Sequence, residues 1–271
     1  MNIRKTLESA HDKLREKDIA SFQLDAQLLL SHVLGKSREF LLANPEYVLT
    51  SRETTKFERC ISRRIDREPI CYITNSIEFY GNNFLIDKRV LAPRVETETI
   101  VENAIKSAPK HSRLIDIGTG SGAIAISIAK ERPDLEITAT EISQDALDVA
   151  TQNASNLIKN HNIQFIKSDL FNNVEGVYET VVTNLPYVSL DNIDNMKPEV
   201  KKEPAVALYG GSGDGLDLYR KFYKQLPDYI KPRSMVYHES DPWQHEALIK
   251  LAKSANLLSI LEDYFILGFK R

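Results

Sequence analysis

Four consecutive residues near the middle of the chain offer groups that could hold a planar amine. Asn184 carries a side-chain amide oxygen, and Leu185 contributes a main-chain carbonyl that precedes Pro186. Tyr187 adds a flat aromatic face. If the Asn184 and Leu185 oxygens each accept one N–H, the lone pair of a weakly nucleophilic NH2 group can face an activated methyl group. Alignment of this kind is worth roughly 7–11 kcal/mol. A plain turn is the other interpretation, because asparagine and proline are common turn residues.

A glycine-rich segment, residues 118–122, follows a short apolar run and precedes an apolar helical pattern. This order predicts a buried strand, a tight turn and a helix. Gly118, Gly120 and Ala123 fit the pattern G-x-G-x-x-G/A, and Glu141 follows at a distance suited to an acid that binds ribose hydroxyls. The pattern serves NAD and S-adenosylmethionine equally. A turn that only packs a helix against a strand is the third interpretation.

Size and charge exclude several classes of protein. A chain of 271 residues is long enough for one large and one smaller domain. The net charge of -3 gives no global reason to expect binding of nucleic acid or of an anionic membrane. No apolar run approaches the roughly 20 residues of a membrane helix, and the first residues lack the apolar core of a signal peptide. We therefore expect a cytoplasmic protein without a membrane partner.

Metal and disulfide chemistry are not expected. Cys60 and Cys71 are too far apart for a C-x-x-C pair and too few for a disulfide framework, so we interpret both as packing residues. The six histidines form no H-E-x-x-H motif and no Cys/His cluster.

Residues 1–68 have the apolar spacing of a small helical domain. Apolar residues recur at helical intervals over residues 3–14 and 24–33, and Gly35 supplies a stop. Residues 50–53 match a capping box at the start of a further helix. Helices this short are not stable alone, so they must pack together as a bundle.

One face of that further helix is basic. Its five members recur at intervals of four, three, four and four residues: Arg52, Lys56, Arg59, Arg63 and Arg67. A solvated surface diluted by nearby acids is one interpretation of this basic stripe. A docking surface for an acidic or RNA-associated partner is the other.

Residues 69–92 are expected to link the helical domain to a second domain, residues 93–271. The linker pattern predicts strands at residues 70–73, 77–80 and 84–86, with a hairpin signal between the last two. From Pro93 a helix is expected to reach about Ala108, with acids in its first turn where the helix dipole favours them.

Strand and helix patterns alternate through the second domain and end in a hairpin over residues 257–270. Such alternation predicts an α/β fold, a parallel sheet with helices on both faces. Gly118, Glu141, Asp169 and Asn184 all follow predicted strands, at the edge where such sheets bind ligands. Residues 188–216 form a long irregular segment that we expect to cover this edge.

Taken together, these motifs resemble the bacterial protein-(glutamine-N5) methyltransferases that act on peptide chain release factors, the HemK/PrmC family. The likeness spans nearly the whole chain. It is carried by residues 93–98, 116–122, 141, 168–171 and 184–187, by residues 24–30 of the helical domain, and by residues 203–220 of the covering segment.

The resemblance implies a Rossmann-like class I methyltransferase sheet, with S-adenosylmethionine as cofactor and S-adenosylhomocysteine as product. Glu141 would bind the ribose, and Asp169 with the Leu170 main chain the adenine. Asn184 would contact both the cofactor and, with the Leu185 carbonyl, the glutamine of a Gly-Gly-Gln loop in a class 1 release factor. The methionine end would be bound by the glycine-rich segment: Gly118, Thr119, Gly120, Ser121 and Gly122.

By the same resemblance the helical domain helps to recognise the release factor, while Pro186 and Tyr187 complete the catalytic set. Two positions depart from the family pattern. Leu185 stands where the family usually has proline; leucine keeps the carbonyl but loses that residue's rigidity. Glu141 stands where the family usually has aspartate, and its extra methylene still lets the carboxylate reach a ribose.

Other activities share part of this pattern. Ribosomal RNA adenine methyltransferases have a motif like residues 184–187, but the acidic net charge and the match at residues 93–98 count against them. A glutamine methyltransferase of a ribosomal protein would differ only in its substrate-recognising parts. An NAD-dependent oxidoreductase should place a hydride-positioning His, Lys or Tyr set at the strand ends, and none is found there. We expect a monomer that acts on no nucleic acid.

Overall fold

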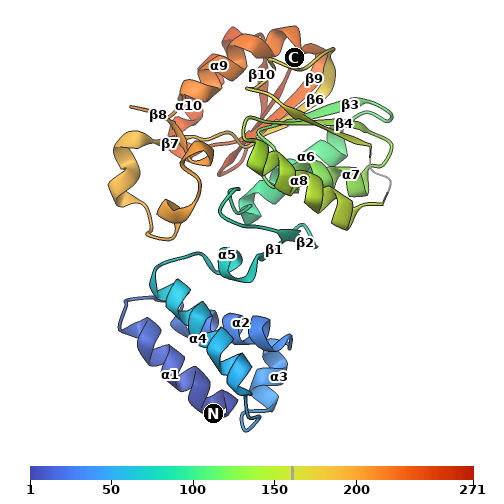
Figure 1. Cartoon of the computed structure of the whole chain (residues 1–271). Helices are drawn as coiled ribbons and strands as arrows, with labels where there is room; N and C mark the ends of the chain where they lie inside the picture. Colours follow the sequence, from blue (N-terminus) through green and yellow to red (C-terminus); the bar gives the residue numbers. More distant parts are fainter. Residues whose placement is uncertain (160–161) are drawn as a thin grey trace. The chain divides into compact units, whose positions relative to one another are not determined.

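A computed structural model describes residues 1–159 and 162–271. The chain forms two compact units (Figure 1). The first, the helical unit, comprises Met1–Ser76 together with Lys197–Lys202. The second, the sheet unit, comprises Ile77–Met196 and Glu203–Arg271. The helical unit therefore includes a short segment that belongs, in sequence, to the middle of the sheet unit.

The helical unit is built from short helices that share one apolar core. Its core includes Leu14, Leu29, Phe57 and Ile61, whose side chains are almost completely buried. The predicted signals fix several helix ends. The helices are α1 Ile3–Arg15, α2 Phe22–Leu34, α3 Arg38–Ala43, α4 Ser51–Ile65 and α5 Ile70–Thr74.

Two of the predicted helix signals are confirmed. Thr50 and Glu53 form the capping box of α4, each side chain accepting a hydrogen bond from the other residue's backbone N–H. Gly35 ends α2 in a left-handed conformation with φ of 62°.

The strand predicted at residues 70–73 is wrong. These residues form the helix α5, which follows Pro69 and ends at Asn75 in a left-handed conformation. A run of four apolar residues does not distinguish a strand from a helical turn by itself. Proline is well tolerated at the start of a helix, and Ile73 joins the apolar core of the helical unit.

The predicted basic stripe lies on α4 only as far as Arg63, because α4 ends at Ile65 and Arg67 follows it with a left-handed backbone. Two residues of the stripe are used inside the helical unit. Arg63 donates to Glu68 and to the Tyr72 carbonyl. Arg67 forms an ion pair with Glu199, whose oxygen lies 3.3 Å from Arg67 Nη1. These two guanidinium groups therefore hold the unit together, which favours a structural role for this end of the stripe.

The sheet unit contains a seven-stranded sheet with the order β10-β11-β9-β6-β3-β4-β5. Five of its strands are parallel and contiguous: β9 Ile230–Glu239, β6 Tyr178–Thr183, β3 Arg113–Ile117, β4 Glu136–Glu141 and β5 Ile163–Lys167. At one side, β11 (Ile266–Lys270) and β10 (Leu258–Glu262) continue the sheet as an antiparallel hairpin. The predicted α/β class and its terminal hairpin are confirmed.

Helices cover both faces of this sheet. Figure 1 shows α6 (Glu98–Ser107), α7 (Ala123–Glu131) and α8 (Gln144–Leu157) on one face. The other face carries α9 (Asp217–Gln225) and α10 (His245–Ser254). Because both faces are covered, the central strands are largely buried, and residues 114–117 of β3 are buried without exception, Asp116 included.

The remaining elements of the chain are short strands and 3-10 helices. A predicted hairpin is confirmed as β1 Ser76–Phe79 and β2 Asn82–Leu85. Residues 188–216 contain more order than expected: β7 (Val188–Ser189) pairs with β8 (Tyr209–Gly211), and three 3-10 helices lie between them. The other 3-10 helices are η1 Val95–Thr97, η5 Leu226–Asp228 and η6 Pro242–Gln244.

None of the helices in the described residues combines the length and the apolar character needed to cross a lipid bilayer.

Candidate active site

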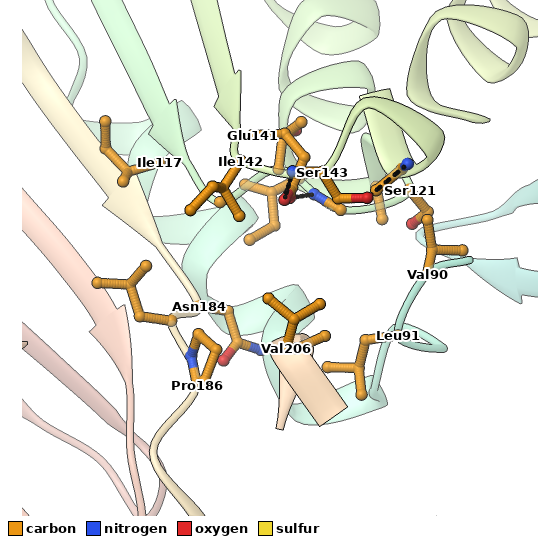
Figure 2. A pocket seen from close by; sticks show the side chains of 18 of the residues that line it. Val90, Leu91, Ile117, Ser121, Glu141, Ile142, Ser143, Asn184, Pro186 and Val206 are labelled. Atoms are coloured by element: carbon orange, nitrogen blue, oxygen red, sulfur yellow. Dashed lines mark hydrogen bonds between the residues drawn. The ribbon is translucent and has the colours of Figure 1, made fainter. Parts of the chain in front are cut away.

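A pocket opens at the carboxyl ends of β3, β4 and β6, within the sheet unit (Figure 2). All the predicted site residues except Gly122 and Tyr187 line it. The lining set among them is Gly118, Thr119, Gly120, Ser121, Glu141, Asp169, Leu170, Asn184, Leu185 and Pro186. Residues 206 and 207 of the predicted covering segment also contribute to the wall. The structure thus brings strand ends that are far apart in sequence to one cavity; the roles of these residues remain predictions.

The glycine-rich segment presents its backbone to the pocket. The Gly118 and Thr119 amides donate to the Thr140 carbonyl at 2.9 and 2.8 Å, which fixes the turn against β4. Gly120 has φ of 55°, and a Cβ added there would meet no atom within 4 Å. A ligand can therefore approach the main chain at this point without side-chain interference.

Gly122 serves the packing of helices instead. It precedes α7 with φ of 82°, and an added Cβ would lie 2.7 Å from Ile126 Cδ1 and 3.2 Å from Ala150 Cβ. Ala150 belongs to α8, so a glycine here lets α7 and α8 approach closely. That explains why Gly122 stands in the motif without lining the pocket.

Glu141 ends β4 and is held by the main chain on both oxygens. Its Oε2 accepts from the Gly120 amide and its Oε1 accepts from the Ser143 amide, each at 3.0 Å (Figure 2). The side chain is 9% exposed, so its orientation is defined. Each oxygen keeps a second lone pair, and such a fixed carboxylate suits the two hydroxyls of a ribose.

Asp116 lies beneath the glycine-rich segment and was not singled out as a separate site residue. It is fully buried, and the Thr119 hydroxyl donates to its Oδ2 at 2.6 Å. Burial raises the pKa of Asp116 to about 7, against the effect of the Thr119 hydrogen bond. A carboxyl group that braces the turn from below explains why an acid precedes the glycines.

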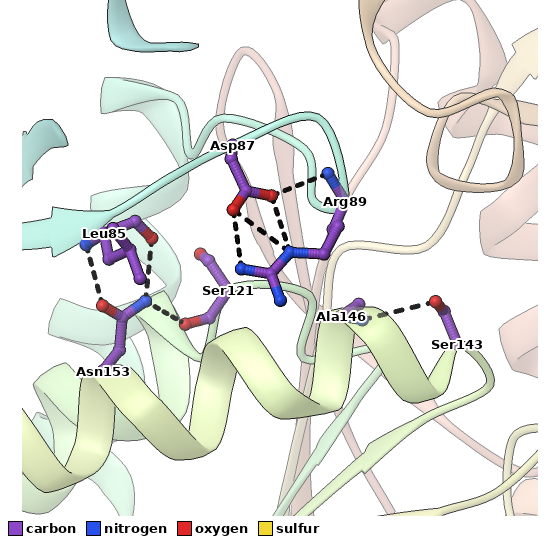
Figure 3. Close-up of polar contacts among 7 residues, drawn as sticks. All are labelled: Leu85, Asp87, Arg89, Ser121, Ser143, Ala146 and Asn153. Carbon is purple, nitrogen blue, oxygen red and sulfur yellow. Dashed lines mark hydrogen bonds and ion pairs between the residues drawn. The ribbon is translucent and has the colours of Figure 1, made fainter. Parts of the chain in front are cut away.

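Asn153 connects the hairpin to the glycine-rich segment. Its Oδ1 accepts from the Leu85 amide at 2.8 Å, while its Nδ2 donates to the carbonyls of Leu85 and Ser121 (Figure 3). Arg89, a few residues further along, lines the pocket and is held by Asp87 through its guanidinium group. The Arg89 hydrogen bonds lower the pKa of the Asp87 carboxyl. The hairpin is thereby tied to the pocket rim.

Asn184 follows β6 at the pocket wall. The end of β6 is anchored because the Thr183 hydroxyl donates to the Ile117 carbonyl at 2.7 Å. Asn184 Nδ2 donates to Thr97 Oγ1 at 3.4 Å. Within the described part of the chain, no donor reaches Asn184 Oδ1 or the Leu185 carbonyl. Two acceptors beside the pocket are therefore free for a ligand.

Tyr187 does not line the pocket. Its hydroxyl donates to Glu239 Oε1 at 3.0 Å, and burial together with the nearby Glu239 carboxylate raises the pKa of Tyr187 far above its usual value. The Tyr187 hydroxyl therefore stays protonated and donates its hydrogen bond to Glu239.

The chain resembles known protein families over most of its length. Residues 5–74 match the PrmC N-terminal domain family, and residues 95–199 match the methyltransferase small domain family. The release factor glutamine methyltransferase of Koribacter versatilis is 38% identical over 237 residues, which cover 86% of this chain and 84% of that protein. The chain belongs to the family of release factor glutamine methyltransferases.

Other relatives give the same result. The release factor glutamine methyltransferase of Clostridium acetobutylicum is 34% identical and covers 96% of this chain and 93% of its own length. A bifunctional methyltransferase of Rickettsia felis is also 34% identical, but the chain spans only 56% of that longer protein. The family predicted from the motifs is confirmed.

Solved structures support the fold alone. A methyltransferase from Pyrococcus furiosus superposes with a TM-score of 0.51 and 15% identity, covering 82% of this chain and 98% of that chain. A T. thermophilus 16S rRNA N2 G1207 methyltransferase, in complex with AdoMet and guanosine, gives a TM-score of 0.50 and 16% identity, covering 72% and 49%. The class I methyltransferase fold is thus confirmed.

Two buried polar residues beside Asn184 had no predicted role: Thr97, which belongs to the motif at residues 93–98, and Glu239, which belongs to none of the motifs. Thr97 and Glu239 are 2% and 3% exposed, and the Thr97 hydroxyl donates to Glu239 Oε2 at 2.5 Å. Glu239 ends β9, the strand beside β6, so it stands at the same edge as Asn184. The rule that polar residues at strand ends gather at one edge could have identified Glu239.

Proposed function

We propose that this protein transfers a methyl group from S-adenosylmethionine to the side-chain amide nitrogen of the glutamine in the Gly-Gly-Gln loop of a class 1 peptide chain release factor. The observation that carries this proposal is the pair of free acceptors, Asn184 Oδ1 and the Leu185 carbonyl, in the pocket that Glu141 also lines.

The donor set of the pocket suits S-adenosylmethionine. Glu141 offers a fixed carboxylate to the ribose hydroxyls, and the open backbone at Gly120 allows close approach of the methionine end. Asp169 and the Leu170 main chain stand beside them for the adenine. When bound, S-adenosylmethionine supplies a methyl group that its sulfonium sulfur has already activated.

Asn184 and Leu185 would orient the substrate amide. The two N–H groups of the glutamine donate to Asn184 Oδ1 and to the Leu185 carbonyl, which leaves the nitrogen lone pair directed out of the plane of the amide. The new N–C bond forms as the S–C bond breaks, and one N–H proton then leaves to water. The products are N5-methylglutamine and S-adenosylhomocysteine.

No strong base is needed for this step. The amide proton becomes acidic only after the new N–C bond has formed, so water can accept it. The nearby Tyr187 hydroxyl stays protonated, because burial and Glu239 raise the pKa of Tyr187. Catalysis then depends on alignment, which general estimates put at roughly 7–11 kcal/mol.

Methyl transfer can be tested with labelled S-adenosylmethionine and three separate acceptors: a release factor with unmodified glutamine, a ribosomal protein, and unmodified ribosomal RNA. Mass spectrometry of the products should locate one methyl group on the glutamine of the Gly-Gly-Gln loop. A release factor with that glutamine changed to alanine should take no label. Label found only in the RNA or only in the ribosomal protein would refute the proposal.

A further inference from the structure

We infer that Glu239 is a positioning residue for methyl transfer: through Thr97 it fixes the Asn184 amide so that the amide oxygen faces the substrate. This inference rests on the proposed function, because it concerns the orientation of the group that would hold the substrate glutamine.

The hydrogen bonds run in one direction along three side chains. Asn184 Nδ2 donates to Thr97 Oγ1 at 3.4 Å, and Thr97 Oγ1 donates to Glu239 Oε2 at 2.5 Å. A carboxylate can only accept hydrogen bonds, so the Thr97 hydroxyl must donate its single hydrogen bond to Glu239. The Thr97 oxygen can then only accept a hydrogen bond from Asn184, so Asn184 must turn its NH2 group toward Thr97. The Asn184 oxygen is left on the other side of the amide.

Burial makes this relay rigid. Thr97 and Glu239 are 2% and 3% exposed, so water is in a poor position to replace either partner. The other oxygen of Glu239 accepts from the Tyr187 hydroxyl at 3.0 Å, and its main-chain carbonyl accepts from the Tyr219 hydroxyl at 2.5 Å. Glu239 is thus fixed at its carboxylate and at its backbone.

Burial of a charged Glu239 costs desolvation free energy. Within the described residues no cation forms an ion pair with it. Burial raises the pKa of Glu239, while hydrogen bonds from Thr97, Tyr187 and Asn184 oppose that rise. A glutamine of the same shape would remove the cost of the charge, but its NH2 group could donate to Thr97 and reverse the relay. Only the carboxylate specifies the direction.

The first test compares Glu239→Gln with wild type in single-turnover methylation of a release factor. We expect the rate to fall by roughly 10- to 100-fold, the range for a lost hydrogen bond to a charged group, while the Kd for S-adenosylmethionine stays within about threefold. Equal losses in rate and in cofactor affinity, or an unchanged rate, would overturn the inference.

Glu179→Gln provides the matched control. Glu179 is a partly buried carboxylate of β6, at the opposite end of that strand from Asn184, and it accepts from the Arg113 amide. Its loss should leave both the transfer rate and the cofactor affinity near wild type.

A double-mutant cycle tests the relay itself. Thr97→Val removes the hydroxyl but keeps the shape of the side chain. If Glu239 acts through Thr97, the double variant should transfer methyl groups at a rate within about twofold of Glu239→Gln alone. If the rate loss of the double variant instead equals the product of the two single-variant losses, the inference is overturned.

Thr97→Val also serves alone if Glu239→Gln fails to fold. It should slow transfer by roughly fivefold or more, the expected effect of one hydrogen bond, with unchanged affinity for S-adenosylmethionine. A normal rate would refute the relay. If the wild-type protein fails to methylate the release factor, the proposed function is wrong. If the wild-type protein methylates it and the variants do so at the same rate, only the positioning role is wrong.

Discussion

The two halves of the pocket are held together in different ways. In the glycine-loop half, comprising residues 118–122 and Glu141, backbone amides donate to a carboxylate and a carbonyl. In the amide half, comprising Thr97, Asn184, Tyr187 and Glu239, side chains bond to side chains. The first half should therefore be sensitive to backbone conformation, and the second to the identity of individual side chains.

Each half is also braced by a buried carboxyl group whose pKa is raised by burial: Asp116 lies beneath the glycine-loop half, and Glu239 belongs to the amide half. The donor to Asp116 is Thr119, three residues away in sequence. Thr97 and Tyr187 donate to Glu239 through their hydroxyl groups, and they are separated from it by 142 and 52 residues. The turn above Asp116 is thus braced locally and joined by Glu141 from the adjacent strand β4, whereas the amide half exists only after β6 and β9 lie side by side.

The strongest test of this division is Asn184→Ala. Loss of one aligned acceptor should slow methyl transfer on the order of 10³-fold, comparable with the loss of an oxyanion-hole donor. The Kd for S-adenosylmethionine, measured by calorimetry, should change only a few fold. Asn103→Ala, in helix α6, should leave both quantities unchanged. Collapse of cofactor binding in Asn184→Ala would show that the halves are not separable.

A glycine substitution should act on stability. In Gly122→Ala the left-handed backbone costs about 1–2 kcal/mol and the crowding against Ile126 and Ala150 about as much again, so we expect a loss of about 3 kcal/mol in the free energy of unfolding. Gly120→Ala carries only the backbone cost, about 1–2 kcal/mol. Urea denaturation of both variants measures the difference. Equal losses would contradict the packing role of Gly122.

Glu141→Gln should weaken cofactor binding with little effect on the transfer step. A glutamine can accept from only one of the Gly120 and Ser143 amides, and losing a hydrogen bond to a charged group costs about 1.5–3 kcal/mol, or roughly 10- to 100-fold in Kd. The single-turnover rate at saturating S-adenosylmethionine should stay near wild type. Glu136→Gln, at the exposed start of the same strand, is the control. A saturated rate that falls as far as the affinity would contradict the division.

Asp116 predicts a pH dependence of stability. Its folded pKa of about 7 lies above the unfolded value of 3.8, so between these values the unfolded state releases the proton first. Raising the pH from 5 to 7 should therefore lower the free energy of unfolding by about 2 kcal/mol relative to Asp116→Asn, with a further loss of only about 0.4 kcal/mol that is nearly complete by about pH 8. Urea denaturation of the two proteins at each pH measures this difference. A constant difference across this range would show that Asp116 does not titrate there.

Local patterns were sufficient for much of this molecule. The capping box at Thr50 and Glu53, the hairpin over residues 76–85 and the strand-turn-helix around Gly118 all depend on neighbours within a few residues. The alternation of apolar runs and helical periodicity was sufficient for the α/β class, because parallel strands must be covered on both faces. Strand ends then placed Glu141 and Asn184 at one edge.

Patterns without a local cause were not predictable. The apolar residues 70–73 were expected as a strand, and their burial in the helical unit made them a helix. Glu199 belongs by sequence to the covering segment, yet it pairs with Arg64 in the helical unit at 2.9 Å. The ion pair joins residues 135 positions apart (199 − 64), and no spacing rule connects them.

By itself, the sequence determined the fold class, the glycine-rich turn, the family and the edge of the sheet that holds the site, because each follows from short-range periodicity or from a contiguous motif. Tertiary structure alone decided that Gly122 packs helices, that Tyr187 faces Glu239, and that a carboxylate at the end of β9 orients an amide at the end of β6. The physical reason is that hydrogen-bond direction depends on which groups meet in space, and strand order brings β9 beside β6 although 46 residues separate Thr183 from Ile230 (229 − 183).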